Sequence, residues 1–266
     1  MAISDVPAVE QESAVAAQSS PELTAVILTL NEAEHIEDCI KSLSGVDRVI
    51  VFDSFSQDDT VQLATAAGAT VLQSKFENYA QQRNSALEAI ETDWVFFVDA
   101  DERGTREIVH EIRQVIAERP QMGWYVPRHN IIFGRLTQGA GWYPDYQLRL
   151  FRHGRVHYVR PVHEIAEVDG DIGYLANPLI HYNYRDEAHF HQTQDKYSTY
   201  DATILKQQDI HPQPHNYLLQ PWRQFWWRFV QLKGYRDGFH GLRLCLYMAY
   251  YEWVKYRKLA VLWREE

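Results

Sequence analysis

The chain has 266 residues, 45% of them apolar and 23% charged, which is enough for a large folded domain with an appendage and excludes a disordered chain. A formal net charge of -10 makes the surface as a whole a poor match for nucleic acid, which proteins bind through Lys and Arg. Cys39 and Cys245 are the only cysteines, so a disulfide framework is excluded and a reducing compartment is favoured. No stretch reaches about 18 uncharged apolar residues, so no membrane span is predicted and the expected location is the cytoplasm.

Residues 1–21 are rich in Ser, Ala, Glu and Gln and lack the basic and apolar segments of a secretory signal. We expect a disordered leader here. The composition changes again near residue 216, so we expect the main domain to cover residues 22–215 and a second segment to cover residues 216–266.

Strands and helices are predicted to alternate from residue 23 to about residue 118. Apolar runs predict four strands, at residues 23–30, 48–52, 69–72 and 94–98. Helices are predicted between them, at about residues 32–43, 59–67 and 78–90. This alternation with short loops predicts a parallel sheet of right-handed βαβ units. From about 122 to 182, shorter runs with Gly, Pro and aromatic residues predict a mixed or antiparallel extension of the sheet.

Polar side chains are concentrated where the predicted parallel strands end. Thr29 and Asn31 follow the first strand, and Asp53 follows the second. Asp99 and Asp101 follow the fourth strand directly. Because sheets of this kind bind ligands beyond the carboxyl ends of their strands, we expect a binding site at this edge.

The triplet Asp99-Ala100-Asp101 is the strongest chemical signal in the sequence. A diphosphate leaving group needs its charge neutralised, and Mg²⁺ or Mn²⁺ held by one or two carboxylates and phosphate oxygens can do this. The alternative is a solvated loop before a helix, because Asp101 and Glu102 precede a predicted one and such triplets arise often by chance. Asp53 could accept hydrogen bonds from a pyrimidine base or a ribose, with a simple Asx turn as its alternative.

Residues 216–266 are predicted to form a helical appendage rich in aromatic and basic residues. The part from Pro221 onward holds five of the eight tryptophans and has nine basic residues against four acidic ones. Trp and Tyr favour the headgroup level of a bilayer and basic residues attract anionic lipid, so an anionic membrane surface is an expected partner. Packing of the same aromatic residues against a neighbouring domain is an equal alternative.

Several segments resemble a known family in content and in chain order. Those that carry the general resemblance are Val26–Glu32, Asp53–Asp58, Tyr79–Asn84 and Trp94–Arg103. They resemble the family 2 glycosyltransferases with the GT-A fold, over roughly residues 23–260. More narrowly, Gly141–Phe151 and Val162–Glu164 are similar to the lipopolysaccharide-core β-glucosyltransferase branch. Phe55 departs from the pattern, because the family usually has Gly there.

The resemblance implies a GT-A-like, Rossmann-like α/β fold, with a mixed, mainly parallel sheet flanked by helices. It implies inverting transfer of a hexose, most plausibly glucose from UDP-glucose, to a glycolipid or a lipid-linked saccharide. It also implies dependence on Mn²⁺ or Mg²⁺ and a peripheral position on the cytoplasmic face of a membrane. A catalytically silent module that binds a nucleotide sugar or a membrane surface is the alternative.

Individual roles follow from the same resemblance. The residues expected around the donor are Thr29, Asn31, Glu32, Asp53, Arg83 and Asp99. Asp101 is the expected metal ligand, and His163 is expected as a further one because imidazole suits Mn²⁺. The alternatives are an exposed helical arginine for Arg83 and a core or turn histidine for His163. The other histidines, His181 among them, are interpreted as surface or structural residues.

Asp145 is the expected general base. An inverting transfer needs a carboxylate on the acceptor side to take the hydroxyl proton, and one such base suffices when a metal neutralises the leaving diphosphate. Without the resemblance, Pro144-Asp145 would be interpreted as an ordinary turn.

Two other enzyme classes fit the sequence poorly. A phosphatase that uses paired aspartates places them after its first strand and has Thr or Val two residues beyond the second Asp, whereas Glu102 and Arg103 follow here. A sugar-1-phosphate nucleotidyltransferase needs a Gly-rich, basic loop after its first strand, and residues 29–32 are neither.

Overall fold

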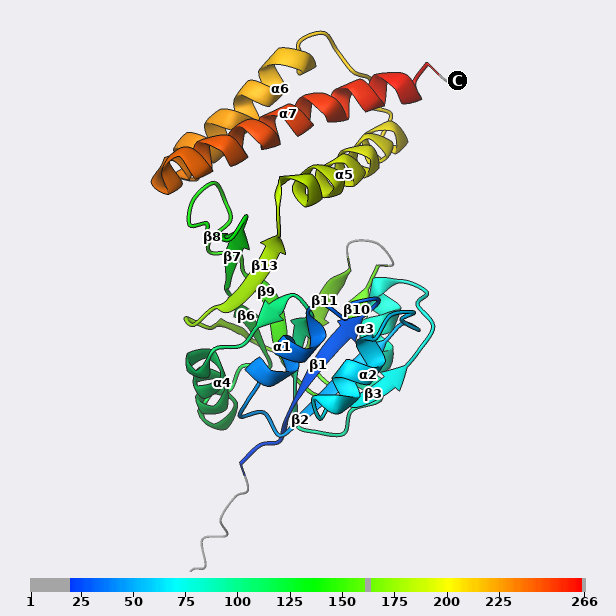
Figure 1. The fold of residues 1–266 in the computed structure, drawn as a ribbon, viewed down its shortest axis with the longest axis vertical. Coiled ribbons are helices and arrows are strands. Elements are labelled where there is room, and N and C mark those ends of the chain that lie inside the picture. Colours follow the sequence, from blue (N-terminus) through cyan, green and yellow to red (C-terminus); the bar gives the residue numbers. More distant parts are fainter. Residues whose placement is uncertain (1–19, 161–163, 265–266) are drawn as a thin grey trace, which may run out of the picture.

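The computed structural model describes residues 20–160 and 164–264 (Figure 1). The predicted leader lies almost wholly outside the described residues. A seven-stranded sheet forms the centre of the lower body, in the order β12-β6-β9-β4-β1-β2-β3. Its strands are β1 (Leu23–Thr29), β2 (Arg48–Asp53), β3 (Thr70–Gln73), β4 (Trp94–Asp99), β6 (Gly123–Val126), β9 (Gln147–Arg152) and β12 (Ile172–Tyr174).

The sheet is mixed and mainly parallel, as predicted. Adjacent strands are parallel from β4 through β1 and β2 to β3, whereas β9 runs antiparallel to both β4 and β6. Strand β9 lies within residues 122–182, where short apolar runs with Gly, Pro and aromatic residues predicted a mixed or antiparallel extension of the sheet.

Helices cover both faces of this sheet. They are α1 (Ile36–Ser42), α2 (Thr60–Ala66), α3 (Tyr79–Glu88) and α4 (Arg106–Glu118). Alternation within β1 explains the two layers, because Ile27 belongs to the core under α1 and α4, whereas Val26 belongs to the core under α3. Side-chain caps define two helix starts: Asn78 accepts a hydrogen bond from the backbone of α3, and Thr105 from that of α4.

Two smaller sheets extend this body. One has the order β5-β13-β7-β8, with β5 (Glu102–Arg103), β13 (Leu179–Tyr184), β7 (Arg128–Ile132) and β8 (Arg135–Leu136). The other is the antiparallel pair β10 (Val156–Val159) and β11 (Ile165–Val168). The first small sheet leads from the lower body toward the C-terminal helices (Figure 1).

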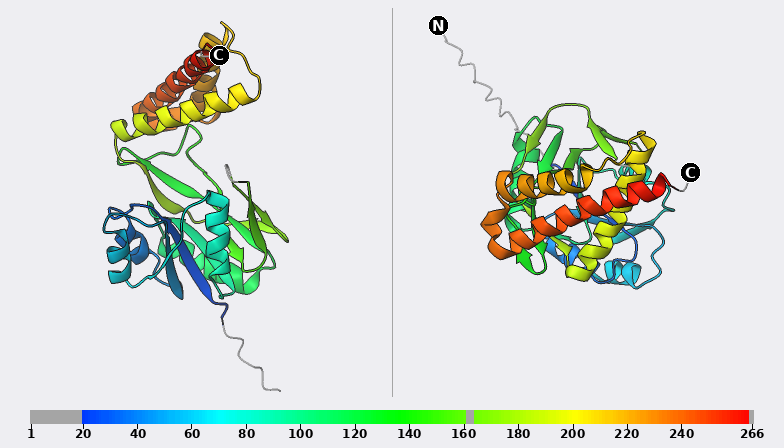
Figure 2. Two further views of the ribbon diagram at one scale, coloured as in Figure 1. Left: turned by 90° about the vertical axis from the view of Figure 1, so that its right-hand side faces the viewer. Right: turned by 90° about the horizontal axis from the view of Figure 1, so that it is seen from above.

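The C-terminal part is helical, and it forms a layer at the far end of the molecule (Figures 1 and 2). Its elements are α5 (Glu187–Gln207), α6 (Asn216–Trp226), a π-helical turn η1 (Trp227–Gln231), a 3₁₀ turn η2 (Gly234–Asp237) and α7 (Gly238–Leu262). Helix α7 packs on both α5 and α6. Helix α5 lies before the expected domain boundary at residue 215, yet it packs on α7, which lies after it. The boundary stays a prediction. Within the described residues, none of the helices combines the length and the apolar character that crossing a bilayer requires.

Candidate active site

A cleft of about 650 Å³ lies at the carboxyl ends of β1 and β4, under Tyr197 of α5. The predicted site residues that line it are Thr29, Glu32, Arg83, Asp99 and Asp101. Asn31 lines a neighbouring cavity of about 790 Å³, which also includes Glu32 and Asp101. The structure thus brings six of the predicted residues together, at the edge of the sheet where the sequence placed them.

Asp53 is buried beside this cleft without lining it. Its carboxylate accepts hydrogen bonds from Thr29 Oγ1 at 3.1 Å, from Gln73 Nε2 at 3.0 Å, and from both the backbone nitrogen (2.9 Å) and the hydroxyl of Ser56. Burial alone would raise the pKa of Asp53, but the hydrogen bonds from Ser56 and Gln73 outweigh it and lower the pKa. Four donors saturate the carboxylate, so direct contact with a nucleoside would displace one of them.

Asn31 connects the loop after β1 to the loop after β2 by hydrogen bonds. It adopts the left-handed conformation, with φ of 57°, which asparagine tolerates better than most residues. Its side-chain oxygen accepts from Gln57 N at 2.8 Å, and its own backbone nitrogen donates to Ser56 Oγ at 2.8 Å. One residue later, Glu32 N donates to Thr60 Oγ1 at 2.8 Å.

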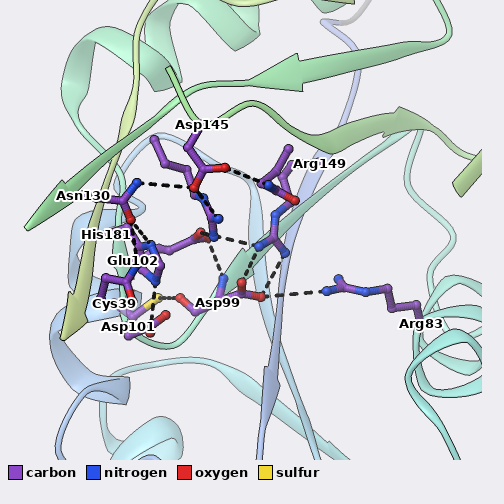
Figure 3. A network of polar contacts seen from close by, with 12 residues as sticks. Cys39, Arg83, Asp99, Asp101, Glu102, Asn130, Asp145, Arg149 and His181 are labelled. Carbon is purple, nitrogen blue, oxygen red and sulfur yellow. Dashed lines mark hydrogen bonds and ion pairs between the residues drawn. The ribbon is translucent and has the colours of Figure 1, made fainter. Parts of the chain in front are cut away.

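Asp99 is held by Arg149, a residue that sequence analysis did not single out. Arg149 Nη1 donates to Asp99 Oδ1 at 2.9 Å, and Nη2 contacts the second carboxylate oxygen (Figure 3). Burial opposes ionisation, but the Arg149 charge outweighs it, so the pKa of Asp99 lies well below its usual range. Arg83 Nη2 lies 3.9 Å from the same carboxylate. Asp99 is therefore already neutralised by arginine.

Arg83 points into the cleft and is not an exposed helical arginine, since only 12% of its side chain is exposed. Its Nε lies 3.4 Å from Glu164 Oε1, and its guanidinium lies 5.2 Å from the centre of the Phe97 ring. Arg83 thus joins α3 to the strand-end carboxylates. His163 lies outside the described residues.

Glu102 is buried and accepts several hydrogen bonds, whereas sequence analysis noted only that it precedes a helix. Its carboxylate accepts from Asp99 N at 2.9 Å, from Arg128 Nη1 at 3.1 Å and from Arg149 Nη2 at 3.4 Å. The helix that follows is capped by Thr105, three residues farther on. Glu102 therefore connects the two arginines.

Asp145 lies at the other end of this network from Asp101 (Figure 3). Its carboxylate accepts from Arg128 Nε at 2.9 Å, from Gln147 Nε2 at 3.0 Å and from Asn130 Nδ2 at 3.3 Å. Burial raises the pKa of Asp145, but the Arg128 charge and the hydrogen bonds outweigh it and lower the pKa, so the group is ionised at neutral pH.

A third cavity, of about 470 Å³, lies along the middle of the network, beside Asp99, Arg128 and Arg149. It shares Arg83, Asp99 and Glu164 with the cleft and extends to Arg128 and Gln147, the side chains that hold Asp145. Asp145 itself does not line it. The role of Asp145 as a base stays a prediction.

Asp101 faces a histidine. His181 Nε2 lies 3.2 Å from Asp101 Oδ2, and His181 Nδ1 lies 2.8 Å from Asn130 Oδ1. The Asn130 amide is oriented by its donation to Trp142 O at 2.8 Å, so its oxygen faces the histidine and Nδ1 carries the hydrogen. The other ring nitrogen, Nε2, is the one that faces the carboxylate.

This pair fits a divalent cation. An imidazole nitrogen and a carboxylate oxygen are both ligands that Mn²⁺ accepts, and here they face each other. Adjacent ligands of an octahedral ion with bonds of about 2.1 Å lie about 3 Å apart, close to the observed separation. The pKa of Glu32 is raised to about 7, first by burial and then by the neighbouring carboxylates Asp101, Asp58 and Asp99.

The described residues alone do not complete a cation site, because no group of three His, Cys, Asp or Glu side chains among them is arranged to hold a metal. Phosphate oxygens of a donor would have to supply the remaining ligands. Of the two interpretations of His181, surface or structural, burial excludes the first and leaves the second. His181 and Asp101 are 80 residues apart in the chain, and the pairing of β5 with β13 brings them together. Local residue spacing therefore could not predict the pair.

Comparison with known proteins identifies the family of the chain. Residues 24–155 match the family model for glycosyl transferase family 2. The lipopolysaccharide core biosynthesis glycosyltransferase LpsC of Rhizobium meliloti is 27% identical over 253 residues, which cover 89% of this chain and 91% of that protein. An uncharacterized glycosyltransferase of Rickettsia felis is 39% identical over 100 residues, covering 37% of this chain and 35% of that protein.

Among solved structures, a glucosyl-3-phosphoglycerate synthase from Mycobacterium tuberculosis, in complex with Mn²⁺, UDP and glucosyl-3-phosphoglycerate, has a TM-score of 0.49. That chain is 19% identical, and the match covers 71% of this chain and 81% of that one. The family match spans β1 to β9 and thus includes Asp99, Asp101, Asp145 and Arg149. The chain is a glycosyltransferase of family 2.

Proposed function

We propose that this protein is an inverting, metal-dependent hexosyltransferase whose donor is a nucleotide diphosphate sugar, with UDP-glucose as the first candidate. The observation that carries the proposal is the Asp101–His181 pair, in which Asp101 lines the cleft at the end of β4 beside Glu32. The Asp101 carboxylate alone would repel a diphosphate placed beside it, because like charges repel. A divalent cation at the pair removes that obstacle.

Asp101 and His181 would hold Mn²⁺ or Mg²⁺, with donor phosphate oxygens and water as the other ligands. When bound, the ion neutralises the charge that develops on the leaving diphosphate. Asn130 supports this arrangement by fixing the tautomer of His181, the usual task of an outer partner of a ligating histidine. If His163 also contributes a ligand, it would add to this pair.

The residues of the chain have separate tasks in the proposed reaction. The acceptor hydroxyl oxygen forms a bond to the anomeric carbon while the bond from that carbon to the diphosphate breaks. The hydroxyl proton passes to the Asp145 carboxylate, which Arg128 and Gln147 orient. Arg83 lies between the two cavities and positions the donor.

A glycolipid or a lipid-linked saccharide is the proposed acceptor. Support comes from the similarity to LpsC over 91% of that protein, whose name places it in lipopolysaccharide core biosynthesis. An acceptor of this class requires the enzyme to act at a membrane surface, and we propose a peripheral position on the cytoplasmic face.

The test is release of the nucleotide from a panel of nucleotide sugars in the presence of Mn²⁺, with and without a lipid-linked acceptor. One donor should release its nucleotide slowly by hydrolysis without the acceptor, and faster by transfer of the sugar when the acceptor is present. A silent module that only binds nucleotide sugars would bind a donor and release nothing at any acceptor concentration.

A further inference from the structure

Helix α6 presents its apolar residues to solvent. The outward side chains form a stripe at helical spacing, which we call the outer stripe: Leu218, Leu219, Trp222, Trp226 and Val230, the last in the π-helical turn. Leu218 is 78% exposed and Trp222 is 60% exposed. Isolated exposed apolar residues are ordinary, but a contiguous group on one helix face marks a surface that contacts something.

The opposite face of α6 and η1 is polar, although it packs against protein. Tyr217 Oη donates to the backbone oxygen of Tyr256 on α7 at 3.4 Å. Arg228 Nη1 donates to Ala140 O at 2.7 Å, and the side-chain oxygen of Gln220 is buried. A helix of a water-soluble protein normally buries its apolar face. In α6 only Tyr217 of these inward residues packs in an apolar cluster, whereas the outer stripe stays exposed to solvent.

The stripe lies at the end of the molecule farthest from the seven-stranded sheet. Helices α6 and α7 lie side by side there, and α5 lies between them and the lower body (Figure 2). Helix α7 adds exposed Leu246, Tyr250 and Val261 at helical spacing. Trp222 packs against Phe225 and Trp226, with ring centres 6.2 Å apart in both cases, so the aromatic side chains support one another.

Positive charge accompanies these apolar residues. Arg223 and Arg257 are exposed on α6 and α7. Lys233 and Arg236 are also exposed, in the turn between these helices, where they line a cavity of about 300 Å³ with the loop before β9. Within residues 20–160 and 164–264, none of the four forms an ion pair with a carboxylate. Indole rings and basic side chains together are typical of a surface that lies at the headgroup level of an anionic bilayer.

We propose that the outer faces of α6 and α7 bind the surface of a bilayer that contains anionic phospholipid, with Trp222 and Trp226 inserted at the headgroup level. The inference deepens the proposed function, on which it rests for its purpose, since a lipid-linked acceptor has to be reached at a membrane. A second copy of the chain is the competing occupant. A two-fold dimer would bring identical patches together and so juxtapose the same unpaired cations, which disfavours it.

Flotation of the full chain with vesicles tests the inference, with phosphatidylcholine vesicles that contain or lack phosphatidylglycerol. The chain should bind the anionic vesicles at low salt and bind the neutral ones weakly. The double variant Trp222→Glu, Trp226→Glu should lower the partition coefficient about tenfold or more, because each change replaces an interfacial anchor by a charge of the wrong sign. Tyr174→Glu, at an exposed residue of the edge strand β12, is the matched control and should bind as the unmodified chain does.

A second pair, Arg223→Glu and Arg257→Glu, should reduce binding to the anionic vesicles and weaken its dependence on salt. Circular dichroism and the melting temperature establish that each variant is folded. Unchanged binding of the tryptophan variant would overturn the inference. Self-association that this variant abolishes, without vesicle binding by the unmodified chain, would assign the stripe to an interface between copies. Binding is measured without donor, so its outcome is independent of whether the protein transfers a sugar.

Discussion

Both terminal nitrogens of Arg149 bind the carboxylate of Asp99. The first aspartate of the strand-end triplet is therefore neutralised by a buried arginine from the antiparallel strand β9. The same guanidinium reaches Glu102, which also accepts a hydrogen bond from Arg128. Asp101, by contrast, pairs with His181, and the arginine network lies between it and Asp145.

Removing the central arginine should destabilise the fold. Arg149→Met leaves two carboxylates, Asp99 and the fully buried Glu102, without their shared partner. Breaking a buried pair by removing one member typically costs 3–5 kcal/mol; because Asp99 is partly exposed, we expect a loss of about 3 kcal/mol in the free energy of unfolding. Urea denaturation of Arg149→Met and of Arg155→Met gives the comparison. Arg155 pairs with Asp169 on the surface, so its loss should cost less than about 1 kcal/mol. Equal effects of the two changes would contradict the buried network.

Asp53 should make the stability depend on acid pH. Its pKa is lowered in the folded protein, so its ionised form stabilises the fold above the pKa of an unfolded aspartate, about 3.9. This contribution is lost as the pH falls through the folded-state pKa. In Asp53→Asn, the new NH₂ group faces hydrogen-bond donors that the carboxylate had accepted from. We therefore expect the free energy of unfolding to fall by about 2 kcal/mol at pH 7, and by less near pH 3, where the carboxylate of the unmodified protein is partly protonated. Unfolding free energies of both proteins from pH 3 to pH 7 would show this. A difference that does not shrink toward acid pH would argue against an ionised Asp53.

Asp145→Asn preserves the shape of the side chain and removes the proposed proton acceptor. We expect kcat to fall by about 10²- to 10⁴-fold, the usual contribution of a general base, with little change in donor affinity. Asp171→Asn, at an exposed residue of the loop before β12, is a matched control and should keep full activity. If donor affinity collapses while kcat survives, Asp145 belongs to the donor site or to the arginine network only.

His181 should contribute to metal affinity. His181→Ala removes the imidazole that faces Asp101, and we expect Mn²⁺ to bind at least about tenfold more weakly in the presence of UDP, as followed by electron paramagnetic resonance. His189→Ala, in the neighbouring cavity, is the control and should change the affinity little. Equal Mn²⁺ affinity in both variants would remove His181 from the site.

The sequence predicted those parts of this protein that depend on local pattern. The apolar runs before Asp53 and Asp99 identify parallel strands, and polar residues at their ends identify the ligand-binding edge. The partners of these residues depend on strand order. Arg149 reaches Asp99 through the β4–β9 pairing, and His181 reaches Asp101 through the β5–β13 pairing; neither pairing follows from residue spacing.

Helix α6 shows the same limit on a smaller scale. Its spacing of Trp, Leu and Gln identifies an amphipathic helix, but the sequence does not say which face meets protein. The contacts of Tyr217 and Arg228 settle that question, since they place the polar side inward.

The initial rate of UDP release from UDP-glucose, with a lipid-linked saccharide acceptor and Mn²⁺, tests the central claim most directly. It is measured for the unmodified protein with and without excess EDTA, and for Asp101→Asn. The proposed chemistry predicts acceptor-stimulated release that EDTA abolishes and that Asp101→Asn lacks, while circular dichroism shows an intact fold. Full release by Asp101→Asn in excess EDTA would contradict it.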